Sequence, residues 1–415
     1  MRSGSGLPSM MARTLTVAVC TLLTVAGCGN TGASSTPPPV VGYQTTPPRI
    51  SAAALHSRGQ VVATTGPLAL WVSALPAGTR ATRITYRSTS GIDGSPHLVT
   101  GAVFVPPGGW PAGGWPLIVY AHGTTGITRD CAPSDRPDMF GDLFAVAANL
   151  AAGYAVVTTD YQGIGVRADE PAPHPYLEPR TAAYNLIDAA RAARSIEPTI
   201  GPRWVVAGSS QGGAAAWATA EQFASYGSGT PNAGQLAGAV AMSPVLDLSF
   251  LPELAQRGTL TNAQRYLYPI VVAGVAHTDS QLDTSALLHG VAANRLATLI
   301  SCSTGKTALA AQVQSRDPAT FTPTNSHTQA EITSMLTRFS LPRTATDIPI
   351  LAIYGSLDDI TPVGDMEKAL GRGCSLGDHL VRLRREGQGH SLDPGPFLGQ
   401  WVRDRVNDAP EESDC

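Results

Sequence analysis

The chain has 415 residues, a formal net charge of −3, 14% charged residues and 43% hydrophobic residues. That much apolar material is enough for a substantial buried core. Basic and acidic residues are nearly balanced and form no basic stripe, which argues against a nucleic acid partner. Glycine and proline together stay below the share that is typical of low-complexity chains.

Residues 1–28 have the pattern of an export signal: a positively charged start, then an apolar run over 14–27 that is too short to span a bilayer. The run ends in "VAGC" at Cys28. Small residues before a cysteine resemble the bacterial lipobox, in which this cysteine becomes lipidated. The alternative is an ordinary signal peptide in which Cys28 is incidental. Residues 29–50 are small, polar and proline-rich, as in a flexible tether. We therefore expect an exported protein, either a cell-membrane lipoprotein or a secreted one.

Eight short segments of the remaining chain are predicted to be strands. They are 83–89, 98–105, 116–121, 154–160, 203–208, 236–242, 348–355 and 379–384. The first two resemble an antiparallel pair joined by a turn. Most of the later ones are continuous apolar runs, as expected for parallel strands buried on both faces.

Helical segments alternate with these strands. The clearest are 142–153, 181–196 and 214–227. Such alternation predicts an α/β fold, a mostly parallel eight-stranded sheet with helices on both faces. We expect this core to comprise residues 51–245 and 346–415. Residues 246–345 are mostly helix-like and indicate a helical cap inserted over the sheet. A separate second domain is the alternative, but the strand pattern resumes at 348 and favours the insertion.

The sequence "GSSQG" at 208–212 lies between a predicted strand and a predicted helix. It matches G-x-S-x-G with Ser210 at the centre. In the nucleophile elbow this serine occupies a sharp strand-to-helix turn that exposes its hydroxyl. The pattern therefore predicts Ser210 as a nucleophile, and Ser209 occupies the variable position.

A serine hydroxyl needs a base to become a good nucleophile, and the order expected here is serine, acid, histidine. The loop after the strand at 348–355 offers Asp358 and Asp359, and either could orient an imidazole. His390 follows the last strand in a glycine-flanked loop and is the expected base. The rival His379 begins a strand. The other histidines precede Asp358 and are in the wrong order.

The oxyanion of the reaction needs hydrogen-bond donors. One is expected to be the backbone N–H of Gln211, the residue after the nucleophile. The other should come from the loop "YAHGTTG" at 120–126. Its N–H of Thr124 is the predicted first donor, and the Thr124 hydroxyl could add a third bond. His122 is expected to be a buried structural residue.

These motifs together resemble the α/β-hydrolases. "RDCAPSD" at 129–135 and "AAGYAVVTTDYQGIG" at 151–165 narrow the resemblance to the secretory lipase family, the lipase-A-like branch. The family pattern G-x-x-D-x-x-x-P selects Asp358 over Asp359. The resemblance also implies a helical lid before the acid strand. It implies hydrolysis of carboxylic esters, including those with longer acyl chains, without a metal or cofactor.

Four cysteines remain after the signal peptide and Cys28 are set aside, which suggests two disulfides in an exported chain. Spacing alone leaves three connectivities open. The family resemblance implies the pairs Cys131–Cys302 and Cys374–Cys415. No zinc-binding spacing is present.

The predicted function is therefore a lipase or esterase with the triad Ser210, His390 and Asp358, which acts on acylglycerols or other lipid esters through an acyl-enzyme. An acyltransferase of the cell envelope with the same triad is one alternative. A non-catalytic lipid-binding lipoprotein is another. The expected partners are the ester substrate and, if Cys28 is lipidated, the membrane. We expect a monomer.

Overall fold

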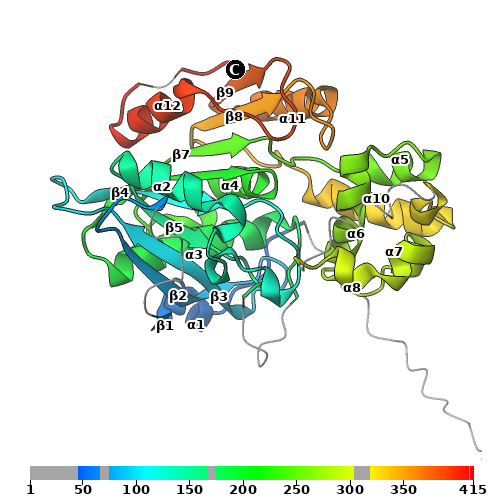
Figure 1. The fold of residues 1–415 in the computed structure, drawn as a ribbon, viewed down its shortest axis with the longest axis horizontal. Helices are drawn as coiled ribbons and strands as arrows, with labels where there is room; N and C mark the ends of the chain where they lie inside the picture. Colours follow the sequence, from blue (N-terminus) through cyan, green and yellow to red (C-terminus); the bar gives the residue numbers. More distant parts are fainter. Residues whose placement is uncertain (1–44, 66–73, 166–172, 231, 303–317, 411) are drawn as a thin grey trace, which may run out of the picture. The chain divides into compact units, whose positions relative to one another are not determined.

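The computed structural model describes residues 45–65, 74–165, 173–230, 232–302, 318–410 and 412–415. A nine-stranded sheet forms their centre (Figure 1). Its strands are β1 (Val61–Thr65), β2 (Arg80–Thr89), β3 (Pro96–Val105), β4 (Trp115–Ala121), β5 (Ala155–Thr159), β6 (Ile200–Ser209), β7 (Gln235–Met242), β8 (Ile350–Gly355) and β9 (Leu380–Arg385). The predicted signal peptide with Cys28 lies outside the described residues, as does most of the predicted tether.

The sheet has the order β1-β2-β3-β5-β4-β6-β7-β8-β9. In this order, the first three pairs (β1–β2, β2–β3 and β3–β5) are antiparallel, and the remaining pairs, from β5–β4 to β8–β9, are parallel. The α/β fold with a mostly parallel sheet is therefore confirmed, but with nine strands instead of eight. The unpredicted strand is β1 at the edge, where four of five residues are exposed and no apolar run marks it.

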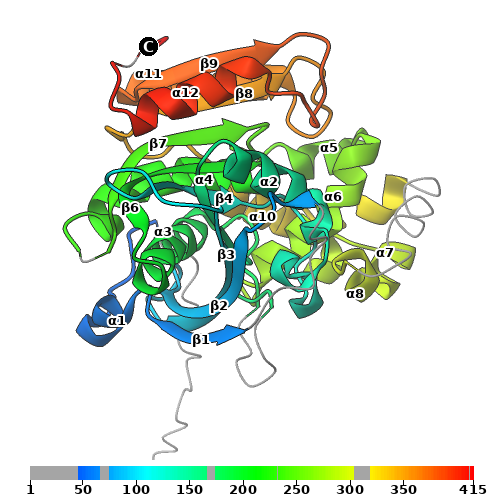
Figure 2. The same cartoon turned by 60° about the vertical axis from the view of Figure 1, so that its left-hand side comes forward.

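Helices cover both faces of the sheet (Figure 2). One face packs against α3 (Pro179–Ile196), α4 (Gln211–Gln222) and α11 (Val363–Leu376), and the other packs against α2 (Leu143–Ala151) and α12 (Pro396–Val406). Strand β4 shows the alternation that allows this. Leu117 and Val119 enter the first core, whereas Ile118 and Tyr120 enter the second.

Residues 246–345, called the cap region below, connect β7 to β8 mainly through helices. They are α5 (Leu251–Arg257), α6 (Asn262–Ala276), η6 (Thr284–Ala286), α7 (Gly290–Asn294), α8 (Leu296–Leu299), η7 (Pro318–Phe321) and α10 (Ser326–Phe339). Their apolar side chains form a third buried cluster around Tyr268, Val272 and Ile332. Figure 1 shows these helices grouped beside the sheet. Tyr176, from the chain before α3, also belongs to this cluster and links the cap region to the core.

Within the described ranges, no helix has the length and hydropathy that crossing a membrane would require.

Candidate active site

Ser210 occupies the sharp turn between β6 and α4. Its backbone has φ 58° and ψ −118°, a conformation that residues with side chains rarely adopt. A Cβ on Gly208 would lie 2.4 Å from the carbonyl oxygen of Gly212, and one on Gly212 would lie 2.0 Å from that of Ala121. The two glycines of the motif are therefore required sterically, because the turn packs directly against the end of β4.

Ser210, His390 and Asp358 form a continuous chain of hydrogen bonds. The Nδ1 of His390 lies 2.8 Å from Oδ2 of Asp358, and its Nε2 lies 2.8 Å from Oγ of Ser210. A carboxylate can only accept at Nδ1, so Nδ1 carries the proton and Nε2 is free to accept the proton of the serine hydroxyl. The three side chains come from the ends of β6, β8 and β9, which meet at one edge of the sheet.

The two adjacent acids differ sharply in their surroundings. The Asp358 side chain is 2% exposed, and its Oδ1 accepts the backbone N–H groups of Ile360 at 2.8 Å and Thr361 at 2.9 Å. Asp359 is exposed, and its backbone carbonyl accepts the Thr261 hydroxyl. The structure therefore brings Asp358 to the imidazole and leaves Asp359 in solvent. Of the two rival histidines, His390 meets the serine, and His379 is exposed before β9.

The sequence analysis missed Ser243, which holds the histidine loop in place. Its hydroxyl donates to the carbonyl oxygen of His390 at 2.7 Å, and its own N–H donates to Ile353 in β8. The residue before it, Met242, accepts the N–H of Ser210 at 2.9 Å. The end of β7 thus fixes both partners of the reacting pair. Its position directly after a strand, beside the elbow strand, was the available signal.

The loop after β4 lies against the elbow, as an oxyanion loop must. A Cβ on Gly123 would be 3.4 Å from the carbonyl oxygen of Ser209 and 3.8 Å from Cβ of Ser210. Thr124 follows and is half-buried, while Gln211 begins α4 and is buried. His122 is 2% exposed, and its ring packs on Tyr161 at 4.4 Å between centroids. Its surroundings are those of the structural residue that the sequence predicts.

Two further residues contact the side chains of the expected oxyanion loop and elbow, and both escaped the sequence analysis. The Tyr176 hydroxyl lies 2.7 Å from Oγ1 of Thr124, and Nε2 of His174 lies 2.9 Å from Nε2 of Gln211. Both come from the segment just before α3. The only sequence signal is "PHPY" at 173–176, and the expected order serine, acid, histidine does not select His174 as a base because it precedes the acid.

The protonation state of His174 follows from its surroundings. Burial lowers the pKa of its imidazole to about 3, so the ring is neutral at physiological pH. Its Nδ1 lies 2.8 Å from the carbonyl oxygen of Gln162 and must donate to it. Nε2 is therefore an acceptor and receives an amide proton from Gln211. The Oε1 of Gln211 is buried without a hydrogen-bond partner among the described residues.

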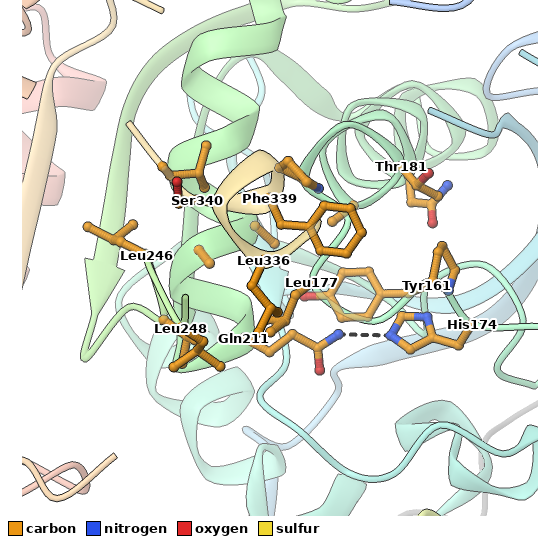
Figure 3. A pocket seen from close by; sticks show the side chains of 18 residues that line it. Tyr161, His174, Leu177, Thr181, Gln211, Leu246, Leu248, Leu336, Phe339 and Ser340 are labelled. Atoms are coloured by element: carbon orange, nitrogen blue, oxygen red, sulfur yellow. Dashed lines mark hydrogen bonds between the residues drawn. The ribbon is translucent and has the colours of Figure 1, made fainter. Parts of the chain in front are cut away.

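A small cavity lies beside Gln211, between the core and the cap region (Figure 3). Tyr161, His174 and Thr181 line it from the core, and Leu336 and Phe339 of α10 line it from the cap region. Its volume is about 30 Å³, which is room for no more than a few water molecules. A cavity of this volume is too small for a fatty acyl chain.

The cysteines follow the predicted pairing in part. Cys374 and Cys415 form a disulfide that ties the end of α11 to the C-terminus. The pair Cys131–Cys302, in contrast, is not bonded, and this prediction is wrong for the structure. The Cys302 thiol points to Oδ2 of Asp130 at 3.5 Å, and burial, Cys131 and Asp130 raise its pKa.

One set of three potential metal ligands occurs in the described part of the chain. The ligand atoms of Asp130, Cys131 and Cys302 lie within 4.8 Å of one another. No hydrogen bond of the described residues joins this group to Ser210 or His390.

Comparison with known proteins decides the family. The profile of the secretory lipases matches residues 139–413, which contain Ser210, Asp358 and His390. The chain belongs to the secretory lipase family. The oxyanion loop at 120–126 precedes the matched range, so its assignment depends on the geometry above. No curated protein matches the sequence significantly.

Solved structures agree on the fold of this secretory lipase family member. Lipase A of Candida antarctica in its closed state is 16% identical, with a TM-score of 0.67 over 86% of this chain and 84% of that one. The ligand-bound rice cell wall degrading esterase LipA of Xanthomonas oryzae is 21% identical, with a TM-score of 0.63 over 85% of this chain and 99% of that one. The predicted α/β-hydrolase fold and the predicted family are both confirmed, and the family supports a lipase or esterase activity.

Proposed function

We propose that this protein is an exported serine hydrolase that cleaves carboxylic esters of lipids. The observation that carries the proposal is the chain of two 2.8 Å hydrogen bonds from Ser210 through His390 to Asp358. A hydroxyl, an imidazole and a buried carboxylate in this order are the groups that acyl transfer to serine requires. The family of secretory lipases supports both the ester substrate and export.

In the first step, Ser210 Oγ attacks the ester carbonyl carbon while Nε2 of His390 takes its proton. Asp358 stabilises the imidazolium and keeps the proton on Nδ1. The tetrahedral intermediate then expels the alcohol, which receives the proton from Nε2. The acyl group remains on Ser210 as an ester.

In the second step, water attacks the acyl-enzyme, and His390 again accepts a proton. The intermediate expels Ser210 Oγ, which recovers that proton, and the free acid leaves. In both steps the negative oxygen faces the backbone N–H groups of Gln211 and Thr124. Each such donor contributes about 3 kcal/mol to transition-state stabilisation in comparable sites.

The side chains around the elbow support a lipid ester as the substrate. Leu336 and Phe339 of the cap region lie beside Gln211 at the start of α4. Apolar side chains favour an acyl chain over a polar substrate.

We also propose that Cys28 carries a lipid anchor. A Cys28→Ala variant should then move from the membrane fraction to the medium, and an unchanged distribution would contradict the anchor.

The activity is tested with p-nitrophenyl esters from acetate to palmitate, on the wild type and on Ser210→Ala. We expect hydrolysis by the wild type, including the longer chains, and none above background by Ser210→Ala with an unchanged circular dichroism spectrum. Labelling of Ser210 by a fluorophosphonate, followed by peptide mass spectrometry, checks the nucleophile. Substantial hydrolysis by Ser210→Ala would overturn the assignment. Absent labelling of the wild type would favour a lipid-binding protein.

A further inference from the structure

Tyr176 lies between the expected oxyanion loop and the cap region. Its side chain is 1% exposed, and its hydroxyl lies 2.7 Å from Oγ1 of Thr124. The body of the side chain packs against Gly274 in the last turn of α6, where an added Cβ would be 2.4 Å from Cβ of Tyr176. The phenol is therefore confined between the cap region and Thr124.

The direction of this hydrogen bond can be deduced. Among the described residues, the Tyr176 hydroxyl has no hydrogen-bond partner other than Thr124. Burial raises the pKa of Tyr176 well above its usual value, so the phenol stays protonated. If Thr124 were the donor, the phenolic proton would be buried without an acceptor, which is costly. Tyr176 is therefore the donor and Oγ1 of Thr124 the acceptor.

This direction leaves the proton of the Thr124 hydroxyl free to point elsewhere. Thr124 is half-buried, and no other side-chain hydrogen bond fixes its hydroxyl among the described residues. It follows Gly123, which lies against Ser209 and Ser210. The hydroxyl proton of Thr124 is therefore available to bond to an oxyanion that develops beside Ser210.

The segment that carries Tyr176 is well placed to hold this geometry. His174, two residues earlier, accepts the amide proton of Gln211, so one short segment contacts both residues of the expected oxyanion site. Pro173 and Pro175 flank His174 and restrict the backbone on either side of it. The Nδ1 of His277, at the end of α6, donates to the carbonyl oxygen of His174 at 2.8 Å.

We propose that Tyr176 is a positioning residue of the ester hydrolysis. By donating to Oγ1 of Thr124, it turns the threonine hydroxyl toward the oxyanion and adds a third hydrogen bond to the two backbone N–H groups. The proposal rests on the function proposed above and deepens it. Tyr176 itself does not touch the substrate and acts only through Thr124.

The test is a double-mutant cycle of Tyr176→Phe and Thr124→Val, measured as kcat and KM on p-nitrophenyl butyrate. Each single variant should lower kcat by between about 10-fold and 100-fold with little change in KM, because the lost bond forms mainly in the transition state. The double variant should be no slower than Thr124→Val, because the phenol has no effect without the threonine hydroxyl. Thr124→Ser keeps the hydroxyl and should retain most of the wild-type kcat.

Tyr268→Phe is the matched control. Tyr268 is another fully buried tyrosine of the cap region, but its hydroxyl has no partner among the described residues. This variant should keep the wild-type kcat. A Tyr176→Phe enzyme as active as Tyr268→Phe, or losses that multiply in the double variant, would overturn the proposal.

The rate of fluorophosphonate labelling separates this inference from the proposed function. The phosphonyl oxygen occupies the oxyanion position, so labelling of Tyr176→Phe should slow in parallel with kcat. If the wild type is labelled at Ser210 and Tyr176→Phe is labelled equally fast, only the role of Tyr176 is wrong. If the wild type is neither labelled nor active, the proposed function is wrong, and the role of Tyr176 with it.

Discussion

At the scale of single residues, the site depends on the strained backbone of Ser210 and on the hydrogen bonds that orient Asp358 and His390. Ser210 keeps a positive φ because the glycines on both sides let the turn pack against β4. Asp358 uses one carboxylate oxygen for two backbone N–H groups and the other for His390. Both carboxylate oxygens of Asp358 therefore accept hydrogen bonds, and Oδ2 can only accept a proton from Nδ1 of His390, which fixes the tautomer of the imidazole.

Replacing Asp358 tests this arrangement. In Asp358→Asn, an amide N–H facing Nδ1 would force the imidazole into the wrong tautomer, so kcat should fall by about 10⁴-fold. Asp359→Asn changes the exposed neighbour in the same way and should keep near-wild-type kcat. The measurement is steady-state hydrolysis of a p-nitrophenyl ester, with thermal unfolding as the check on folding. Equal losses in the two variants would contradict the assignment of Asp358.

Glu221, in α4, is a buried carboxyl that is not part of the Ser210–His390–Asp358 chain. We expect it to make the stability of the protein depend on pH. Burial, with a smaller effect of Asp378, raises its pKa to about 7, although it accepts the N–H of Arg343 at 2.8 Å. A raised carboxyl pKa means that the protonated form is favoured in the folded state. The contribution of this carboxyl to the free energy of unfolding is complete below pH 4.5, its unperturbed pKa. It is lost as the pH rises through about 7, its pKa in the folded protein.

Glu221→Gln removes this loss, because the amide keeps an acceptor for Arg343 and carries no charge. At pH 8 the variant should be more stable than the wild type by up to about 3 kcal/mol, at 1.36 kcal/mol per unit of pKa shift. At pH 4 the two should be equal within error. Urea unfolding at both pH values measures the difference. A variant less stable than the wild type at pH 8 would show that the carboxylate is favourable where it lies.

At the scale of elements, helix α6 connects the cap region to the segment before α3. It does so through His277, which donates to His174, and through Gly274, which receives the ring of Tyr176. Gly274 lies in the last turn of α6, and a glycine within a helix is normally unfavourable. Its presence here is explained by the close approach of Tyr176, which leaves no room for a side chain.

Gly274→Ala should therefore destabilise the protein by about 1–3 kcal/mol, since overpacking outweighs the better helix propensity of alanine. It should also lower kcat, because Tyr176 must shift. Gly371→Ala in α11 is the matched control, as nothing lies within 4 Å of its added Cβ. That variant should gain about 0.5–1 kcal/mol and keep its activity. Thermal and urea unfolding with kcat measure both, and a stabilised Gly274→Ala would disprove the steric argument.

At the scale of the whole molecule, the C-terminus is held to the last strand of the sheet. The disulfide Cys374–Cys415 spans 41 residues of sequence. The N–H of Asp414 donates to Leu380 in β9, and the N–H of Arg382 donates to the Asp414 side chain. The loop that the disulfide closes contains β9, α12 and the His390 loop, so the bond restrains the segment that carries the expected base.

Reduction should lower the free energy of unfolding by about 2–4 kcal/mol, because the unfolded chain gains freedom when a loop of this length opens. Urea unfolding with and without dithiothreitol measures this. The double variant Cys374→Ser/Cys415→Ser should start at the lower stability and show no further loss on reduction, since Cys131 and Cys302 are free thiols. A further loss in that variant would reveal a second disulfide.

Local patterns in the sequence predicted most of the fold and the three residues of the hydrogen-bonded chain. The sequence predicted eight of the nine strands, and most of the later ones were marked by apolar runs, because strands buried on both faces need them. Edge strand β1 was missed because its exposed residues carry no such pattern. The elbow was recognisable because its glycines are a steric requirement within five residues of sequence.

The sequence by itself therefore determined the α/β-hydrolase fold, the family and the candidates Ser210, Asp358 and His390, because each depends on local chemistry in a known order. Only the tertiary structure decided that Tyr176 and His174 contact Thr124 and Gln211, that Ser243 holds the His390 loop, and that Cys131 and Cys302 stay unbonded. The hydrogen bonds among these join residues 37 to 147 positions apart. Packing of the whole chain sets such contacts, and no short pattern encodes them.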